Sequence, residues 1–368
     1  MDETLLFSPE PTSKALFRLA EQALADGAQA LMILAADGNR YDPVELSSWL
    51  QALPVPVCGG IFPQIVFGRM HHETGCIVHG LKGQVRIIET SGLSSSQADY
   101  SAELESALQD LPSPQTVFIV VDGLAQRIAA FLDGVYDMLG SDPVYFGGGA
   151  GSLDFQQRPC IFSNKGLLVD HAQMVLIDRP TRVGVRHGWQ KHAGPFVVTQ
   201  AERNRIISLD YQPAFELYRT LVDADCGDSI NSENFFEIAK GYPFGMERAG
   251  GEVVVRDPIT VIDGTLVCVG EVGPNSIVFL LKGQPEALIA AAESAALAVK
   301  DAGDAPVIMI DCISRVLFLE ARFEEELAAV AAQLDGRALF GALTLGEIAN
   351  RGDGCLEFFN KTMVLAGS

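Results

Sequence analysis

The fold is decided by VFIVVD at residues 117–122 together with VYFGGG at residues 144–149. The first segment is a continuous run of Val, Ile and Phe that ends at Asp122, and such a run is typical of a strand buried on both faces. A helix is expected between the two segments, and the second is again apolar before it ends in three glycines. Two buried strands joined by a helix form a β-α-β unit with parallel strands.

This pattern occurs three times along the chain. A first copy runs from LMIL at residues 31–34 to VPVCGG at residues 55–60, and a third runs from VIMI at residues 307–310 to ALFGA at residues 338–342. Each opening strand leads into an aspartate, namely Asp37, Asp122 or Asp311. After a polar loop, each copy is expected to return in a further strand that contains a cysteine, namely Cys76, Cys160 or Cys355.

A different region lies between the second and third copies. Residues 184–209 and 252–281 alternate between apolar and polar residues or turn sharply, and Asp263-Gly264 is a hairpin signal. We therefore predict an α/β protein of two packed domains, built from repeated β-α-β units with an inserted, mainly β region. The predicted domains are residues 1–210 and 211–368.

The composition excludes several classes of function. Asp and Glu number 47 against 26 for Lys and Arg, which gives a net charge of −21. So acidic a chain is repelled by phosphate backbones and anionic lipid surfaces, so we expect no nucleic-acid and no membrane partner. The amino terminus does not resemble a secretory signal, and the seven cysteines form no C-x-x-C pair. We expect a cytoplasmic protein with reduced cysteines.

The glycine runs are the first candidate site. Ligands of parallel sheets gather beyond the carboxyl ends of the strands, and glycine lets a ligand approach the backbone there. The candidates for ligand contact are Gly59, Gly60, Gly147, Gly148 and Gly149. The alternative is that these glycines only permit close packing of strands.

Three arginines beside apolar strands are the second candidate. Arg186, Arg256 and Arg315 stand out in a chain with few cations, and a guanidinium binds a carboxylate through two hydrogen bonds. The alternative is a buried ion pair with one of the many acidic residues. Cys312 precedes Arg315 by three residues, and a thiolate beside an arginine could act as a nucleophile, although no nearby histidine offers a base.

His187 is the third candidate. An arginine, a glycine and Trp189 surround it in a segment that leads into an expected strand. A histidine beside an apolar pocket can be an axial haem ligand, so haem is a possible cofactor. The alternative is a structural histidine with an ordinary hydrogen bond.

These residues belong to an ordered set of short motifs. They are His187-Gly188-Trp189, Cys312-x-x-Arg315, Gly341-x-x-x-x-Gly346-Glu347 and Phe359-Asn360-x-Thr362. In this order, and over both halves of the chain, the sequence resembles the FIST family of sensory domains. One segment departs from the family pattern, because CGGIFP at residues 58–63 stands where the family usually has a pair of threonines.

The resemblance implies a function. Members of the family are thought to bind small molecules, with amino acids suggested, and to signal to kinases or cyclic-nucleotide enzymes. Some members without an output domain are haem-bearing nitric oxide sensors. The resemblance thus implies a non-enzymatic, stand-alone sensor of an amino acid or similar metabolite, and it adds Trp189 and Glu347 to the candidate ligand-binding residues.

Two other readings remain open. One is an enzyme with Asp122, Asp311, Cys312 and Glu347 on the rim formed by the strand ends. The other is a scaffold that binds a partner protein without a ligand.

Overall fold

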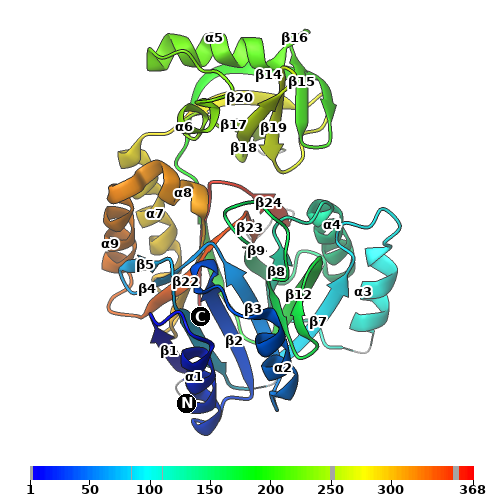
Figure 1. Ribbon diagram of the computed structural model, residues 1–368, viewed down its shortest axis with the longest axis vertical. Helices are drawn as coiled ribbons and strands as arrows, with labels where there is room; N and C mark the ends of the chain where they lie inside the picture. Colours follow the sequence, from blue (N-terminus) through cyan, green and yellow to red (C-terminus); the bar gives the residue numbers. More distant parts are fainter. Residues whose placement is uncertain (1–2, 84, 110, 249–252, 351–355) are drawn as a thin grey trace.

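The computed structural model describes residues 3–83, 85–109, 111–248, 253–350 and 356–368. Within these residues the strands form three six-stranded sheets and one seven-stranded sheet. Figure 1 shows three α/β units that pack together, with a fourth body of mainly β structure above them.

Each α/β unit is built on the predicted pair of parallel strands. The pairs are β2 (Ala30–Ala36) with β3 (Val57–Phe62), β8 (Thr116–Asp122) with β9 (Val144–Ala150), and β21 (Val307–Cys312) with β22 (Leu339–Thr344). The return strands lie antiparallel to the opening strands and are β6 (Cys76–Leu81), β12 (His171–Ile177) and β25 (Met363–Gly367). A leading strand flanks each return strand: β1 (Thr4–Ser8), β7 (Val85–Ser91) or β13 (Arg182–Arg186). The predicted α/β repeat is therefore confirmed.

The helices follow the same repetition. The helices before the opening strands are α1 (Ser13–Ala25), α3 (Tyr100–Leu108) and α7 (Pro285–Val299). Those that connect the parallel strands are α2 (Pro43–Ala52), α4 (Ile128–Leu139), and the pair α8 (Ile313–Leu319) and α9 (Phe323–Gln333). Among the described residues, each unit thus reads strand, helix, strand, helix, strand, hairpin, strand, apart from two short 3₁₀ helices, Asp37–Asn39 and Glu320–Arg322, and an insertion after β13 in the third unit.

The three units interlock through their hairpins, and each copy contributes to a neighbour's sheet. The hairpin β4 (Gln64–Phe67) and β5 (Met70–His72) of the first unit pairs with β22. The hairpin β10 (Ile161–Ser163) and β11 (Gly166–Leu168) of the second unit pairs with β3. The hairpin β23 (Glu347–Ala349) and β24 (Glu357–Phe359) of the third unit pairs with β9. Each copy has its own sheet, and every sheet is completed by another copy.

The alternation of side chains explains why the opening strands are apolar throughout. In β2, Met32 and Leu34 enter a central core that residues of all three units share. Ile33 and its neighbours on the other face pack beneath α1 and α2. Successive residues of a strand point to opposite faces, so a strand with helices on one side and a shared core on the other needs apolar residues at every position.

The fourth body is a barrel with its own apolar core, inserted between β13 and α7. Its strands are β14 (Gln190–Glu202), β15 (Arg205–Leu209), β16 (Gln212–Pro213), β17 (Phe244–Glu247), β18 (Val253–Ile262), β19 (Thr265–Val269) and β20 (Ile277–Lys282). The sheet closes because β14 pairs with both β20 and β15. Helices α5 (Ala214–Cys226) and α6 (Phe235–Ala239) belong to it. The boundary predicted between residues 210 and 211 falls inside this barrel.

One detail of the predicted repeat, the position of the cysteines, is wrong. Cys76 begins a return strand, but Cys160 precedes the exchanged strand β10, and the return strand β12 contains no cysteine; Cys355 lies outside the described residues. The aspartates lie at the ends of the opening strands as predicted, although at slightly different positions. Asp37 follows β2, Asp122 is the last residue of β8, and Asp311 lies one residue before the end of β21.

Candidate functional site

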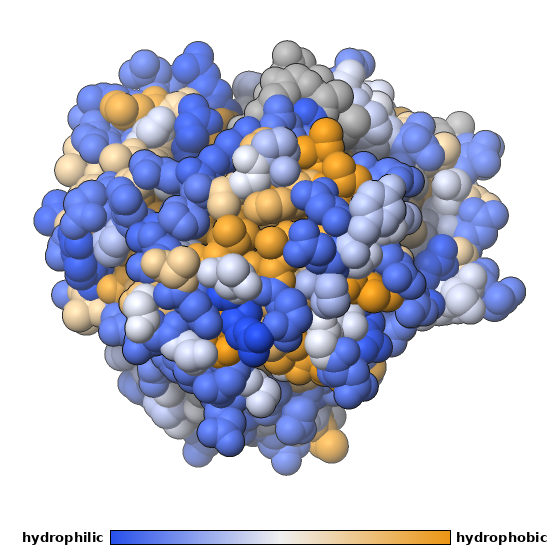
Figure 2. Space-filling view, turned by 90° about the horizontal axis from the view of Figure 1, so that it is seen from above, coloured by the Kyte–Doolittle hydropathy of each residue, from blue (hydrophilic) through white to orange (hydrophobic). Residues whose placement is uncertain are grey.

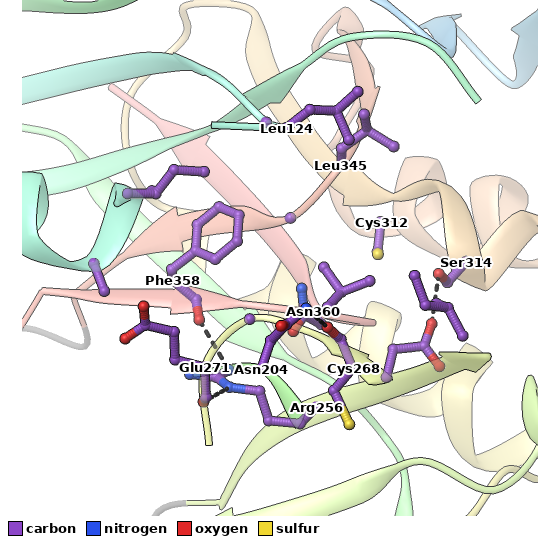
Figure 3. Close-up of a pocket in the computed structure, with 18 of the residues that line it drawn as sticks. Leu124, Asn204, Arg256, Cys268, Glu271, Cys312, Ser314, Leu345, Phe358 and Asn360 are labelled. Atoms are coloured by element: carbon purple, nitrogen blue, oxygen red, sulfur yellow. Dashed lines mark hydrogen bonds between the residues drawn. The ribbon is translucent and has the colours of Figure 1, made fainter. Parts of the chain in front are cut away.

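A cavity of about 870 Å³ lies between the barrel and the second and third α/β units (Figure 3). The second unit contributes residues that follow β8 and the start of α4. The third contributes the start of α8 and the segments after β22 and around β24, and the barrel contributes β17, β18 and β19. The carboxyl ends of β8 and β21 therefore face this cavity, as expected for ligand sites of parallel strands.

The wall of the cavity is largely apolar, whereas buried polar groups lie on one side of it. Apolar residues on the wall include Leu124, Ile128, Leu153, Met246, Leu345 and Phe358. In Figure 3, Asn360 lies between Phe358 and Cys312 and faces Asn204 and Cys268 of the barrel. An apolar wall with a few convergent polar groups is the usual composition of a small-molecule site.

Asn360 is the most informative of these polar residues. It lines the cavity with only 1% of its surface exposed. Neither its Oδ1 nor its Nδ2 has a hydrogen-bond partner in the part of the chain that the structure describes. A buried amide without partners costs free energy, because it has lost its hydrogen bonds to water.

Arg256 lies beside Asn360 and carries a buried cation. Its Nε donates to the carbonyl oxygen of Glu271 at 2.9 Å, and its Nη1 donates to those of Val255 and Phe358 at 3.0 and 3.1 Å. All three acceptors are neutral, and among the described residues no carboxylate lies within ion-pair distance of Arg256. Burial lowers the pKa of this guanidinium to about 10, so it remains charged at neutral pH.

Asp257 follows Arg256 in β18 and connects the barrel to the third unit. Its Oδ2 pairs with Lys361 Nζ at 3.1 Å and accepts a hydrogen bond from Ser314 Oγ at 2.9 Å. Its Oδ1 is buried and has no partner among the described residues. Burial raises the pKa of this carboxyl group, against the opposing effect of the Lys361 cation.

Cys312 and Glu347 form a second group at the edge of the cavity. Cys312 lines it, and burial raises the pKa of the thiol well above its ordinary value. Glu347 lies within hydrogen-bond distance of Thr344 Oγ1 at 2.9 Å, and it accepts from the Thr362 amide at 3.1 Å. Burial raises the pKa of Glu347 to about 8. Both groups are therefore mainly protonated at neutral pH.

Arg315 is fully buried and makes hydrogen bonds to protein groups alone. It pairs with Asp311 at 3.2 Å and with Glu326, and it donates to the carbonyl oxygens of His187 and Leu288 at 2.6 and 3.1 Å. Burial alone would lower its pKa, but the two carboxylates raise it. The geometry matches the ion pair that the sequence left as an alternative, and it ties both ends of the barrel insertion to α8.

The predicted glycines pack against other backbone. Gly59, Gly147 and Gly341 are equivalent in the three units, and each faces its counterpart in the opening strand. A Cβ on Gly147 would lie 1.8 Å from the carbonyl oxygen of Ile119. Gly60, Gly148 and Gly149 have backbone atoms of other segments within 3.0 Å of a Cβ position. None of these six lines the cavity.

The remaining candidates also lie outside the cavity. Arg186 is exposed and donates to Ser294 Oγ and to its neighbour's carbonyl oxygen. Trp189 is buried against Phe318, and its indole N–H donates to the carbonyl oxygen of Lys361 at 3.1 Å. The sequence candidates that do reach the cavity are Arg256 and Cys312, and Glu347 lies directly behind Cys312.

His187 does not fit the role of haem ligand for this cavity. It lies between β13 and β14, and its Nδ1 accepts a hydrogen bond from the Trp189 amide at 3.0 Å. No histidine of the described chain lines the cavity, and the described residues contain no group of three or more metal-binding side chains. Within the same residues, no helix has the length and apolar character needed to cross a membrane.

Asn360 and Asp257 are the cavity residues that the sequence reasoning did not select. The Phe359-Asn360-x-Thr362 motif contained the signal for Asn360, because it places a polar pair directly before an apolar strand. Asp257 follows Arg256 in a strand that is otherwise mainly apolar. What the sequence could not indicate is that Asn360 and Asp257 line one cavity between the barrel and the α/β units.

Comparisons with known proteins cover nearly the whole of this architecture. Residues 29–212 match the family model of the FIST N domain, and residues 214–350 match that of the FIST C domain. The two matches meet within the barrel. No curated protein matches the chain.

Proposed function

This chain belongs to the FIST family, and we propose that it is a sensor that binds a small ligand in the cavity between the barrel and the α/β units. FIST domains are associated with sensory signal transduction and small-ligand binding. The observation that carries the proposal is the cavity of about 870 Å³ with the unpartnered amide of Asn360 beside it.

The position of the cavity supports signalling by movement of the barrel. Asp257 of the barrel pairs with Lys361 of the third unit, and both are almost fully buried. A ligand that binds Asp257 weakens or strengthens the ion pair between Asp257 and Lys361. The ligand-bound and free proteins therefore favour different positions of the barrel. A ligand shifts such an equilibrium by its difference in affinity for the two positions.

A partner protein would then read the position of the barrel, and we propose a signalling enzyme such as a kinase or a cyclic-nucleotide enzyme. Figure 2 shows apolar residues near the middle of the face seen from above, surrounded by hydrophilic ones. Large apolar residues that are exposed on the described part of the barrel include Val197, Tyr211, Ile262 and Ile277. The net charge of −21 favours a protein partner over a nucleic acid. The free cysteines of the described residues suit the reducing cytoplasm.

An enzyme is the second candidate, because the structure brings Asp311, Cys312 and Glu347 together. The raised pKa of the Cys312 thiol weakens this reading, since the thiolate is the nucleophile. Asp122 also takes no part, because its carboxylate accepts hydrogen bonds from Leu124, Gln157 and Asp170 outside this cluster. We therefore favour binding over catalysis.

A haem-bearing gas sensor is the third candidate, and the cavity offers it no histidine within the described residues. Its test is a Soret band in protein expressed with ample haem. A band that disappears in His187→Ala would favour haem over the proposed metabolite sensor.

Thermal shifts across a panel of amino acids, peptides and related metabolites test the main proposal. A ligand at 100 times its Kd stabilises the folded protein by about 2.7 kcal/mol. Leu124→Trp, which places a larger side chain on the cavity wall, should abolish the shift. The control Leu297→Trp changes an exposed leucine of α7 and should retain it. If no compound shifts the melting temperature, or if both variants respond like the unaltered protein, the proposal is refuted.

A further inference from the structure

We infer that the ligand of this cavity is a short peptide, with its carboxylate at Arg256, a peptide group at Asn360 and its ammonium group at Asp257. This assignment rests on the proposed function, because it gives a chemical class to the ligand of the same cavity. It differs from a free amino acid in requiring an amide between the two charges.

The order of the three residues comes from two contacts between the third unit and the barrel. The carbonyl oxygen of Phe358 accepts from Arg256 Nη1 at 3.1 Å, and Lys361 Nζ pairs with Asp257 at 3.1 Å. The segment from Phe358 to Lys361 therefore contacts two neighbouring residues of β18, and Asn360 lies between Phe358 and Lys361 in the sequence. A cation, an amide and a carboxylate thus follow one another beside the cavity.

The amide of Asn360 can form hydrogen bonds with the backbone of a peptide. Its Nδ2 is a donor and its Oδ1 an acceptor, and neither has a partner among the described residues. A peptide backbone offers a C=O to the first and an N–H to the second, and because a trans peptide group directs these two to opposite sides, they come from neighbouring groups of the ligand backbone. Two hydrogen bonds formed in this way satisfy both atoms, whereas a free amino acid such as leucine contains no amide group.

The two charged residues match the ends of the peptide. Arg256 is buried, its hydrogen bonds go to carbonyl oxygens, and no carboxylate of the described residues pairs with it directly, although Glu357 and Glu271 favour its charge from a greater distance. A ligand carboxylate can pair with it directly, and a guanidinium binds a carboxylate strongly. Asp257 Oδ1 is a buried acceptor without a partner, and a ligand ammonium group supplies the donor.

The size and the wall of the cavity also suit a peptide. The volume of about 870 Å³ lies in the upper part of the range of roughly 300–1,000 Å³ for pockets that hold drug-sized ligands. The apolar residues Leu124, Ile128 and Leu345 stand on the wall, where side chains of a peptide would pack. We therefore expect apolar side chains in the preferred peptides.

Isothermal titration with matched ligands tests the assignment. The probes are glycyl-leucine, leucyl-glycine, leucyl-leucine, free leucine, and a depsipeptide of leucyl-leucine in which an ester oxygen replaces the peptide N–H. At least one dipeptide should bind ten times more tightly than leucine, and the depsipeptide should bind about tenfold more weakly than leucyl-leucine, since it leaves Asn360 Oδ1 unsatisfied.

Two variants assign the effect to Asn360. Asn360→Leu should bind the dipeptide and the depsipeptide equally. Ser276→Ala changes another lining residue and should keep the preference. Because the comparison of peptide with depsipeptide uses the unaltered protein, it does not depend on the folding of Asn360→Leu.

The possible failures are distinguishable. If the dipeptides bind no more tightly than leucine, or if Asn360→Leu retains the full preference for the peptide bond, the peptide assignment is overturned. If another compound of the panel binds and Leu124→Trp abolishes its binding, the sensor survives without the peptide. If nothing binds, both proposals fall.

Discussion

Replacement of Arg315 by methionine should strongly destabilise this protein, although Arg315 lies outside the cavity. Its guanidinium is fully buried between Asp311 and Glu326 and donates to the carbonyl oxygens of His187 and Leu288. Methionine fills a similar volume but leaves two buried carboxyl groups and two carbonyl oxygens without their donor. Removing one partner of a buried ion pair typically costs about 3–5 kcal/mol.

Urea denaturation followed by tryptophan fluorescence measures the effect, because Trp189 is buried against Phe318 near this cluster. The matched control is Arg322→Met, which removes an arginine whose ion pairs with Glu286 and Glu325 are solvent-exposed. It should change the free energy of unfolding little, as surface pairs contribute little. The double variant Arg315→Met with Glu326→Leu should recover part of the loss, because it removes the stranded carboxyl as well.

The reasoning would be refuted if Arg315→Met were no more destabilising than Arg322→Met. Equal loss in the single and the double variant would show that the carboxyl of Glu326 is not the source of the cost. Either result would favour the alternative that Arg315 binds a ligand.

Two further predictions concern the core. Gly147→Ala should lower the free energy of unfolding by about 3 kcal/mol or more, because its Cβ would lie 1.8 Å from the Ile119 carbonyl oxygen. The control Gly241→Ala should be tolerated, because no atom lies nearer than 3.5 Å to its Cβ position. Equal melting temperatures of the two variants would contradict this prediction. Glu347→Gln should weaken the pH dependence of stability. The carboxyl of Glu347 has its ordinary pKa of 4.5 in the unfolded chain and a pKa of about 8 in the folded protein. Its protonation therefore stabilises the fold fully below pH 4.5. This stabilisation falls by at most about 1.4 kcal/mol per pH unit as the pH rises towards 8. The urea midpoint of the unaltered protein should be lower at pH 7.5 than at pH 5.5, and this difference should be smaller in Glu347→Gln. An equal difference in both proteins would assign the effect to another group.

Much of the fold could be predicted from local pattern. The three apolar runs with their glycine-ended partners indicated the repeated β-α-β units, because a strand between helices and a shared core needs apolar residues on both faces. The glycines themselves were ambiguous. A glycine that accommodates a ligand and one that accommodates a neighbouring carbonyl, as Gly147 does, have the same sequence pattern.

The exchange of hairpins could not be predicted in this way. The hairpin of β10 and β11 pairs with β3 of another copy, and nothing local distinguishes that pairing from a pairing within its own copy. The cysteine pattern was misleading for the same reason, because Cys76 begins a return strand whereas Cys160 precedes an exchanged strand. Strand pairing over long distances depends on how whole units pack.

The sequence by itself determined that the chain is acidic, that its core is built from three related α/β units, and that its ordered motifs resemble the FIST family. These properties follow from composition and from the period of apolar residues. Only the tertiary structure decided that Arg315 is ion-paired, that Arg256 has no ion pair among the described residues, and that Asn360 lines the same cavity as Arg256 and Asp257. Whether a buried polar group has a partner depends on which segments meet in space, and Arg256 and Asn360 are 104 positions apart in a chain that brings them together.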